Sequence, residues 1–97
     1  MKFQIYNQQY NLPDLIRRAG YKAIGRSDQG ELNCIKPLGR DYPRFHLYIL
    51  ETPEIIKFNL HLDQKRPSYG EETMHSGDYE SETVKSEVQY IKDRILV

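Results

Sequence analysis

The sequence predicts an α+β fold, a two-layer sandwich in which a four-strand antiparallel meander carries a short N-terminal helix and a longer C-terminal helix on one face. Residues 44–50 and 55–63 alternate apolar and polar side chains with a period of two, which is typical of strands with one buried face. Residues 80–96 repeat apolar side chains every three or four positions, which is typical of a helix that packs through one stripe.

The first predicted element is a short helix over residues 12–19. Asn11 can cap its start, and Pro13 is tolerated in the first turn because the first N–H groups of a helix lack partners within it. Gly20 favours its end. The apolar side chains that share one face of this helix are Leu12, Leu15, Ile16 and Ala19.

The four predicted strands cover residues 21–26, 31–37, 44–50 and 55–63. The connection between the last two is short enough for an antiparallel hairpin. Residues 64–78 are polar and rich in turn formers, so we expect a long loop there. The last helix, over 80–96, can cover the same side of the sheet as the first. We therefore expect the opposite face of the sheet to be solvated.

Composition limits the classes of function. A chain of 97 residues fits one domain, here residues 1–97. Residues 1–50 hold eight Lys/Arg against four Asp/Glu, and residues 51–97 hold six against ten, so the chain lacks the overall basic excess of a non-specific nucleic-acid binder. The single cysteine, Cys34, excludes an internal disulfide. With no signal-like or membrane-length apolar run, we expect a cytoplasmic location and no membrane partner.

The polar face of the predicted hairpin holds the residues most suggestive of chemistry. Any register that joins the apolar faces also joins the polar ones, and a tight turn at Pro53-Glu54 would place His46 opposite His61. Asp63 follows on the same strand face as His61, about 7 Å away along the backbone. Two imidazoles and a carboxylate suit a divalent transition metal, with His75 from the long loop as a further ligand. Metal-free acid–base chemistry and an ordinary solvated surface are the alternatives.

The same face gathers cations beside the histidines, which suits an anionic small molecule or RNA. The residues expected to contact such a ligand are Arg44, His46, Tyr48, Lys57, His61, Lys65 and Arg66. A second basic surface, for RNA, would use Arg17, Arg18, Lys22, Arg26, Lys36, Arg40 and Arg44. Residues 63–70, which contain Lys65 and Arg66, lack the glycine spacing of a P-loop. No serine of the sequence lies in a nucleophile elbow. Cys34 lies in the middle of a predicted strand and is not expected to be a nucleophile.

Three classes of function remain open after these observations. The first is a small intracellular binding module that uses the open sheet face for an anionic ligand or nucleic acid. The second is a metal-dependent phosphoester hydrolase with a His/Asp site. The third is a structural or regulatory protein-interaction domain, with a homodimer through edge strands as one arrangement. Whether the protein is an enzyme stays open at this point.

The segment Leu15-Ile16-Arg17-Arg18-Ala19-Gly20-Tyr21, followed by strands, resembles the start of the small HicA-type toxins. The resemblance covers this opening and the coarse order of elements, and it implies a double-stranded-RNA-binding-like fold of helix, strands and helix. The family's Gly-Ser-His signature supplies a catalytic histidine in the early strands. Residues 22–40 contain no histidine, so the resemblance implies the architecture and not RNA cleavage by that residue.

Overall fold

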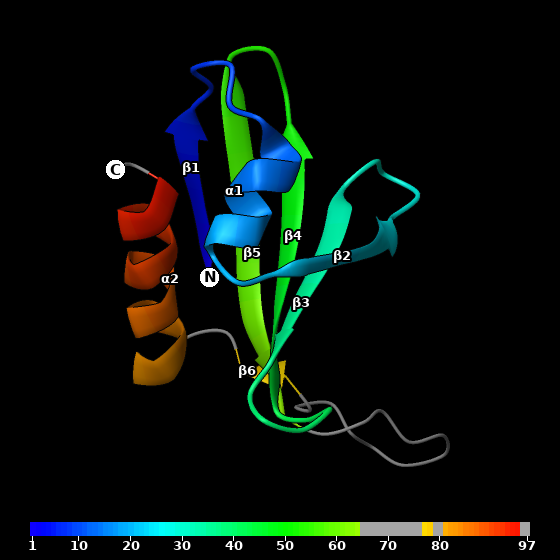
Figure 1. The fold of residues 1–97 in the computed structure, drawn as a ribbon, viewed down its shortest axis with the longest axis vertical. Helices are drawn as coiled ribbons and strands as arrows, with labels where there is room; N and C mark the ends of the chain where they lie inside the picture. The colour runs from blue at the N-terminus through cyan, green and yellow to red at the C-terminus, as the bar shows by residue number, and fades with distance from the viewer. Residues whose placement is uncertain (65–76, 79–80, 96–97) are drawn as a thin grey trace.

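The computed structural model describes residues 1–64, 77–78 and 81–95, and it shows an α+β fold with an antiparallel sheet and two helices (Figure 1). The fold class is therefore confirmed. The elements, in chain order, are β1 (Lys2–Tyr6), α1 (Leu12–Arg18), β2 (Lys22–Arg26), β3 (Leu32–Pro37), β4 (Arg44–Glu51), β5 (Ile55–Asp63), β6 (Gly77–Asp78) and α2 (Glu82–Ile95). No helix among these described residues is long and apolar enough to cross a membrane.

The expected count of four strands is wrong, because a further strand, β1, joins the meander. The sheet order is β1-β5-β4-β3-β2, and the short β6 also pairs with β5. β1 lies antiparallel to β5, with Phe3 opposite Phe58 and Ile5 opposite Ile56. Its five residues alternate polar and apolar, which is a strand signal too short to stand out in the sequence. The Met1 amino group extends this pairing by donating a hydrogen bond to the Leu60 carbonyl at 2.5 Å.

Helix α1 begins and ends where the sequence predicts, within a residue. The Asn11 side chain accepts a hydrogen bond from the Asp14 N–H at 3.1 Å, which caps the first turn. At the other end, the Tyr21 N–H donates to the Ile16 carbonyl at 2.8 Å while Gly20 adopts a φ of 88°. This is a Schellman ending, and it needs glycine because the positive φ strains other residues.

The core lies between the sheet and the helices. Buried side chains of both helices and of β3, β4 and β5 form one hydrophobic cluster. In Figure 1, α1 lies in front of the strands and α2 runs alongside β1. The fully buried members include Leu15, Leu47, Leu60 and Ile91. At 25 cal/mol per Å² of buried apolar surface, burying each of these side chains contributes about 1.5–3 kcal/mol.

The β4–β5 hairpin is confirmed, with the tight turn that the sequence suggests. The Thr52 N–H donates to the Ile55 carbonyl at 2.8 Å across the turn. His46 consequently pairs directly with His61, and Arg44 pairs with Asp63. The apolar residues of both strands then face the helices, and the polar ones share the opposite face, called here the open face.

The C-terminal part departs from the predicted boundaries. Residues 77–78 belong to β6, which pairs Leu62 with Asp78, so the expected loop over 64–78 is wrong there. Residues 65–76 of that loop lie outside the described residues. Helix α2 spans Glu82–Ile95, and its buried apolar side chains are Val84, Val88, Ile91 and Ile95, as the periodicity predicts.

A buried ionic cluster ties α2 to the sheet. The Glu87 carboxylate lies 2.5 Å from the Lys36 ammonium of β3 and accepts a hydrogen bond from the Tyr21 hydroxyl at 2.7 Å. Lys36 thus lies on the helix side of the sheet, with its ammonium 4.4 Å from the Tyr90 ring centroid. This placement removes Lys36 from the second basic surface that the sequence suggests for RNA.

Candidate functional site

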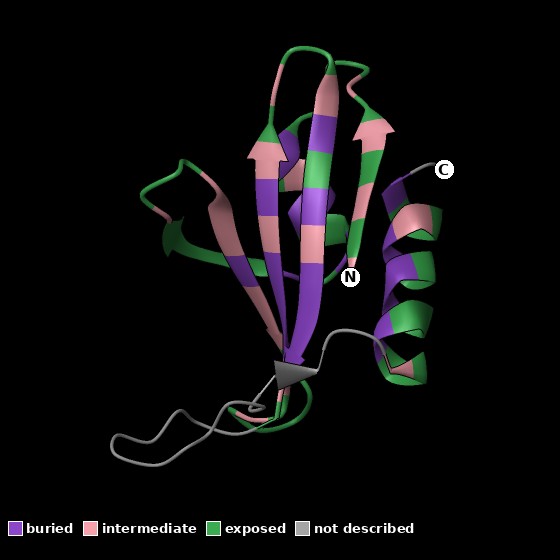
Figure 2. Ribbon diagram, turned by 180° about the vertical axis from the view of Figure 1, so that it is seen from behind, coloured by how far each residue is buried: buried purple, intermediate pink, exposed green. Residues whose placement is uncertain are grey.

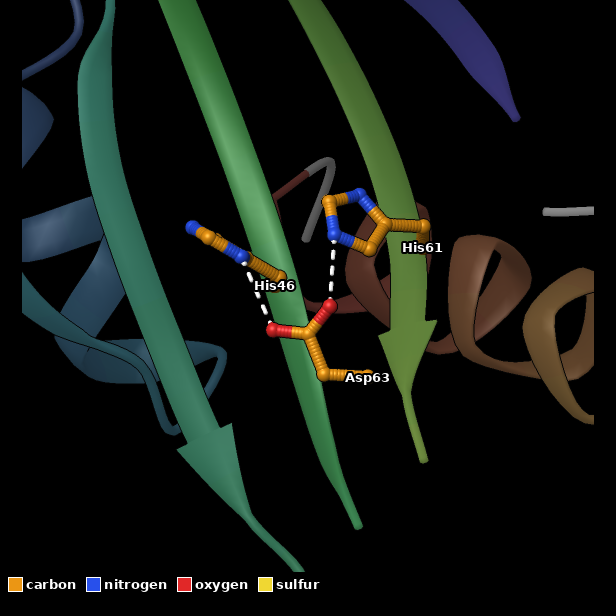
Figure 3. Close-up of side chains that lie close together, drawn as sticks. All are labelled: His46, His61 and Asp63. Atoms are coloured by element: carbon orange, nitrogen blue, oxygen red, sulfur yellow. Dashed lines mark hydrogen bonds and ion pairs between the residues drawn. The ribbon is translucent and has the colours of Figure 1, made fainter. Parts of the chain in front are cut away.

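One carboxylate joins the two histidines of the hairpin (Figure 3). Oδ1 of Asp63 lies 2.8 Å from Nε2 of His61, and Oδ2 lies 3.1 Å from Nδ1 of His46. The strand register explains this convergence, because His46 and His61 are direct partners and Asp63 follows His61 by two residues on the same face. One ligand atom from each residue lies within 4.8 Å of the other two. We call these three residues the His/Asp cluster.

Three neighbours surround the His/Asp cluster on the open face. Arg44 Nε donates a hydrogen bond to Oδ2 of Asp63 at 3.3 Å. The side-chain oxygen Oδ1 of Asn33, on β3, contacts Nε2 of His46. The Tyr48 ring stacks on His46 with centroids 4.5 Å apart, and the two imidazoles lie 4.8 Å apart.

The two histidines of the His/Asp cluster are buried and Asp63 is half-buried, although neither described helix covers this face of the sheet. His46 is 8% exposed and His61 is 7% exposed. Figure 2 shows the consequence along β5, where the alternation of buried and less buried residues ends in a continuous buried stretch. The expectation of a solvated face is therefore wrong at these two positions. The stacked rings of His46, Tyr48 and His61 shield one another from water.

Burial also sets the charge state of the histidines. It lowers the pKa of His46 and of His61 below the ordinary value of 6.5, because an imidazolium loses its hydration. The nearby Asp63 carboxylate raises both pKa values, but by less than burial lowers them. Both rings are therefore neutral near pH 7, the form in which imidazole binds a metal or accepts a proton.

A groove opens beside the His/Asp cluster on the same face. It has a volume of about 490 Å³. Its lining residues are Lys2, Phe3, Gln4, Glu31, Tyr48, Leu50, Lys57, Phe58 and Asn59. Tyr48 connects the two features, since it lines the groove and its ring stacks on His46 of the cluster. Two exposed lysines, Lys2 and Lys57, reach this groove from neighbouring strands.

The residues expected to bind an anion divide into three groups. Arg44, His46, Tyr48 and His61 gather around Asp63, and Lys57 lies apart from them in the groove. Lys65 and Arg66 lie outside the described residues, so their contact with an anion stays a prediction, and the same holds for His75 as a further metal ligand.

Sequence reasoning missed two residues of this face, Lys2 and Asn33. Lys2 escaped notice because β1 was not predicted, although the alternation of residues 2–6 carried the signal. Asn33 lies opposite Tyr48 in the β3–β4 pairing, which becomes visible only when the register of those strands is known.

The donor set of the His/Asp cluster fits a transition metal better than calcium or magnesium, which prefer oxygen ligands. Tetrahedral coordination at about 2.0–2.1 Å places ligand atoms about 3.3 Å apart. The two contacts to Asp63, at 2.8 and 3.1 Å, lie close to that spacing, and each uses a different oxygen of the carboxylate. The three ligand atoms lie within 4.8 Å of one another, so the pair that is farthest apart has to move closer when an ion binds.

Cys34 does not belong to the site. Its side chain is fully buried in the core, and burial raises the pKa of the thiol to about 11. The expectation that it is no nucleophile therefore agrees with its environment.

Comparison of the chain with family models, with curated proteins and with solved structures finds no match.

Proposed function

We propose that the protein is an intracellular binding module whose open face takes a small anionic ligand, with the groove beside the His/Asp cluster as the binding site. The observation that supports this proposal is that two exposed lysines, Lys2 and Lys57, line one groove of about 490 Å³. That volume falls in the range of small-molecule sites, which is about 300–1,000 Å³. It is small for a nucleic-acid strand, which binds along an extended surface.

The lining of the groove suggests the class of ligand. The two ammonium groups suit a phosphate or carboxylate, whose oxygens accept charge-assisted hydrogen bonds. Tyr48 and Leu50 add apolar surface to the groove, so an anion that carries an organic group should bind more tightly than a free inorganic ion. Glu31 at the same groove repels a second negative charge at that end. We infer a ligand with one anionic end, such as a monophosphate ester.

Chemical-shift mapping tests this proposal. The protein is titrated with inorganic phosphate, a nucleoside monophosphate and a short single-stranded RNA. We expect the monophosphate to perturb the amides of Lys2, Tyr48, Lys57 and Asn59, and to do so at lower concentration than inorganic phosphate. Perturbations confined to β2 or α2 would contradict the proposal. Tighter binding of the RNA than of the monophosphate would overturn the small-ligand part of it.

A further inference from the structure

We propose that His46, His61 and Asp63 bind a divalent transition ion such as Zn²⁺, Co²⁺ or Ni²⁺. Nδ1 of His46, Nε2 of His61 and a carboxylate oxygen of Asp63 would be its ligands. The inference goes beyond the proposed function, because it uses none of the groove lysines and stands whether or not the groove binds an anion.

The His46 ring makes two polar contacts, one through each nitrogen. Nδ1 lies 3.1 Å from Oδ2 of Asp63, and Nε2 contacts Oδ1 of Asn33, so both ring nitrogens face oxygen acceptors. A neutral imidazole has a single N–H and can donate to only one of them. If Nε2–H donates to Asn33, the lone pair of Nδ1 points at an anionic carboxylate. That arrangement is repulsive. A cation between Nδ1 and the Asp63 carboxylate would instead attract both the lone pair and the carboxylate.

The positions of the three ligand atoms suit a metal ion better than a proton. A proton between Nδ1 of His46 and Oδ2 of Asp63 would join only those two residues, whereas the ligand atom of His61 lies within 4.8 Å of both. A divalent ion takes the lone pairs of neutral imidazoles directly and needs no imidazolium.

Neighbouring side chains hold the proposed ligands in place. Metal-binding histidines usually donate their other ring N–H to a carbonyl or carboxylate, which fixes the tautomer. Asn33 supplies such an acceptor to His46. Arg44 donates to Oδ2 of Asp63 and so orients the carboxylate, although its positive charge also weakens cation binding. Three protein ligands leave a position for water or for a donor atom of another molecule.

Metal titration of the untagged, chelator-treated protein tests the inference. We expect one equivalent of Zn²⁺ or Co²⁺ to raise the melting temperature, and Co²⁺ to give the visible absorption of a four- or five-coordinate site. Asp63→Asn keeps the shape of the side chain but removes its charge, and His61→Gln removes one ligand. Each should weaken the affinity by tenfold or more. Asp93→Asn, on the exposed side of α2, is the matched control and should bind as the unchanged protein does.

A separate variant checks the role of Asn33. Changing an outer partner of a metal-bound histidine typically costs about 10–100-fold in affinity. We therefore expect Asn33→Ala to weaken binding within that range while leaving the Co²⁺ spectrum of the saturated protein unchanged. A purely structural role of Asn33 would lower the melting temperature but not the affinity of the folded protein.

Two results would overturn the inference. The first is the absence of a stoichiometric ion and of any thermal shift with both Zn²⁺ and Co²⁺, which would leave the cluster as a hydrogen-bonded triad. The second is equal affinity in the Asp63→Asn, His61→Gln and unchanged proteins, which would place the ion elsewhere. The first result is measured on the unchanged protein, so it tests the inference even if a substituted protein fails to fold.

Discussion

His46 and His61 face each other across the β4–β5 hairpin, with ring centroids 4.8 Å apart and one carboxylate, that of Asp63, within hydrogen-bond distance of both. The pairing follows from backbone register, and the neutrality of the rings follows from burial. A buried pair of neutral imidazoles beside a groove with two lysines is the feature from which the proposals start.

Acid should destabilise the metal-free protein. Burial lowers the pKa of both histidines in the folded state, and Arg44 acts in the same direction, as does the Met1 amino group at His61; Asp63 opposes them. Below the unfolded value of 6.5, the unfolded chain therefore binds more protons than the folded one. The stabilisation of the folded state by the neutral histidines is fully present above the unfolded pKa of 6.5. It is lost as the pH falls from that pKa towards the lower pKa of the folded state.

Urea unfolding in chelator at about pH 7.5 and about pH 5.5 measures this loss. We expect a lower midpoint at the acidic pH, and a smaller difference between the two midpoints in His61→Gln. An unchanged difference in that variant would contradict the assignment to His61. Lys85→Gln, which changes an exposed charge on α2, serves as the control.

Loss of the Glu87 carboxylate should destabilise the packing of α2 on the sheet. The side chains of Glu87 and Lys36 are 9% and 20% exposed, so Glu87→Gln leaves the ammonium poorly compensated. We expect a loss of about 1–3 kcal/mol in the free energy of unfolding. Tyr21→Phe removes one hydrogen bond from the same carboxylate and should cost about 1 kcal/mol.

A double-mutant cycle in urea shows whether these two residues act together. Coupling between Tyr21→Phe and Glu87→Gln is expected because the Tyr21 hydroxyl donates directly to the Glu87 carboxylate. Strictly additive losses would mean that the Tyr21 hydroxyl and Glu87 do not interact in solution. Binding of an anion in the groove should not change, because this ionic cluster lies on the other side of the sheet.

The hairpin shows how far the sequence alone can lead. The period-two patterns of residues 44–50 and 55–63 force His46, His61 and Asp63 onto one face, and the structure has them there. Their burial was not predictable, since it depends on how the ring of Tyr48 stacks, which alternation does not encode. The groove was missed with β1, because five alternating residues also suit a loop. The placement of Lys36 on the helix side depends on Glu87, which is distant in sequence.

The Cys34 thiol should react slowly in the folded protein. Burial raises its pKa to about 11, so little thiolate forms at about pH 8 and reagents cannot reach it. Labelling with a thiol-specific disulfide reagent, with and without guanidinium, measures the difference. We expect the unfolded protein to react at least a hundredfold faster. Comparable rates in the two states would contradict the burial of Cys34.

The metal-dependent phosphoester hydrolase remains a proposal that rests on the metal inference. An ion at His46, His61 and Asp63 would adjoin the groove through Tyr48 and would lower the pKa of a bound water. We expect slow hydrolysis of p-nitrophenyl phosphate by the metal-loaded protein, abolished by chelator and by Asp63→Asn. Metal binding without any turnover would reject the hydrolase and leave the metal site standing. His75→Gln tests separately whether that histidine adds a ligand.

The protein-interaction role is a separate prediction with its own measurement. β2 is an edge strand of the described sheet, and all five of its residues are exposed. Such an edge can pair with another strand. Light scattering across a range of concentrations should show a rising average mass if β2 joins two copies. A constant monomer mass would reject the homodimer.

Calorimetric titration with a nucleoside monophosphate tests the central claim, anion binding in the groove, most directly. The comparison uses the unchanged protein, the double variant Lys2→Gln/Lys57→Gln, and the control Lys22→Gln/Lys85→Gln, which removes the same charge from β2 and α2. The account predicts binding that weakens at least tenfold in the first variant, weakens with added salt, and hardly changes in the control. Equal affinity in the two double variants would contradict it.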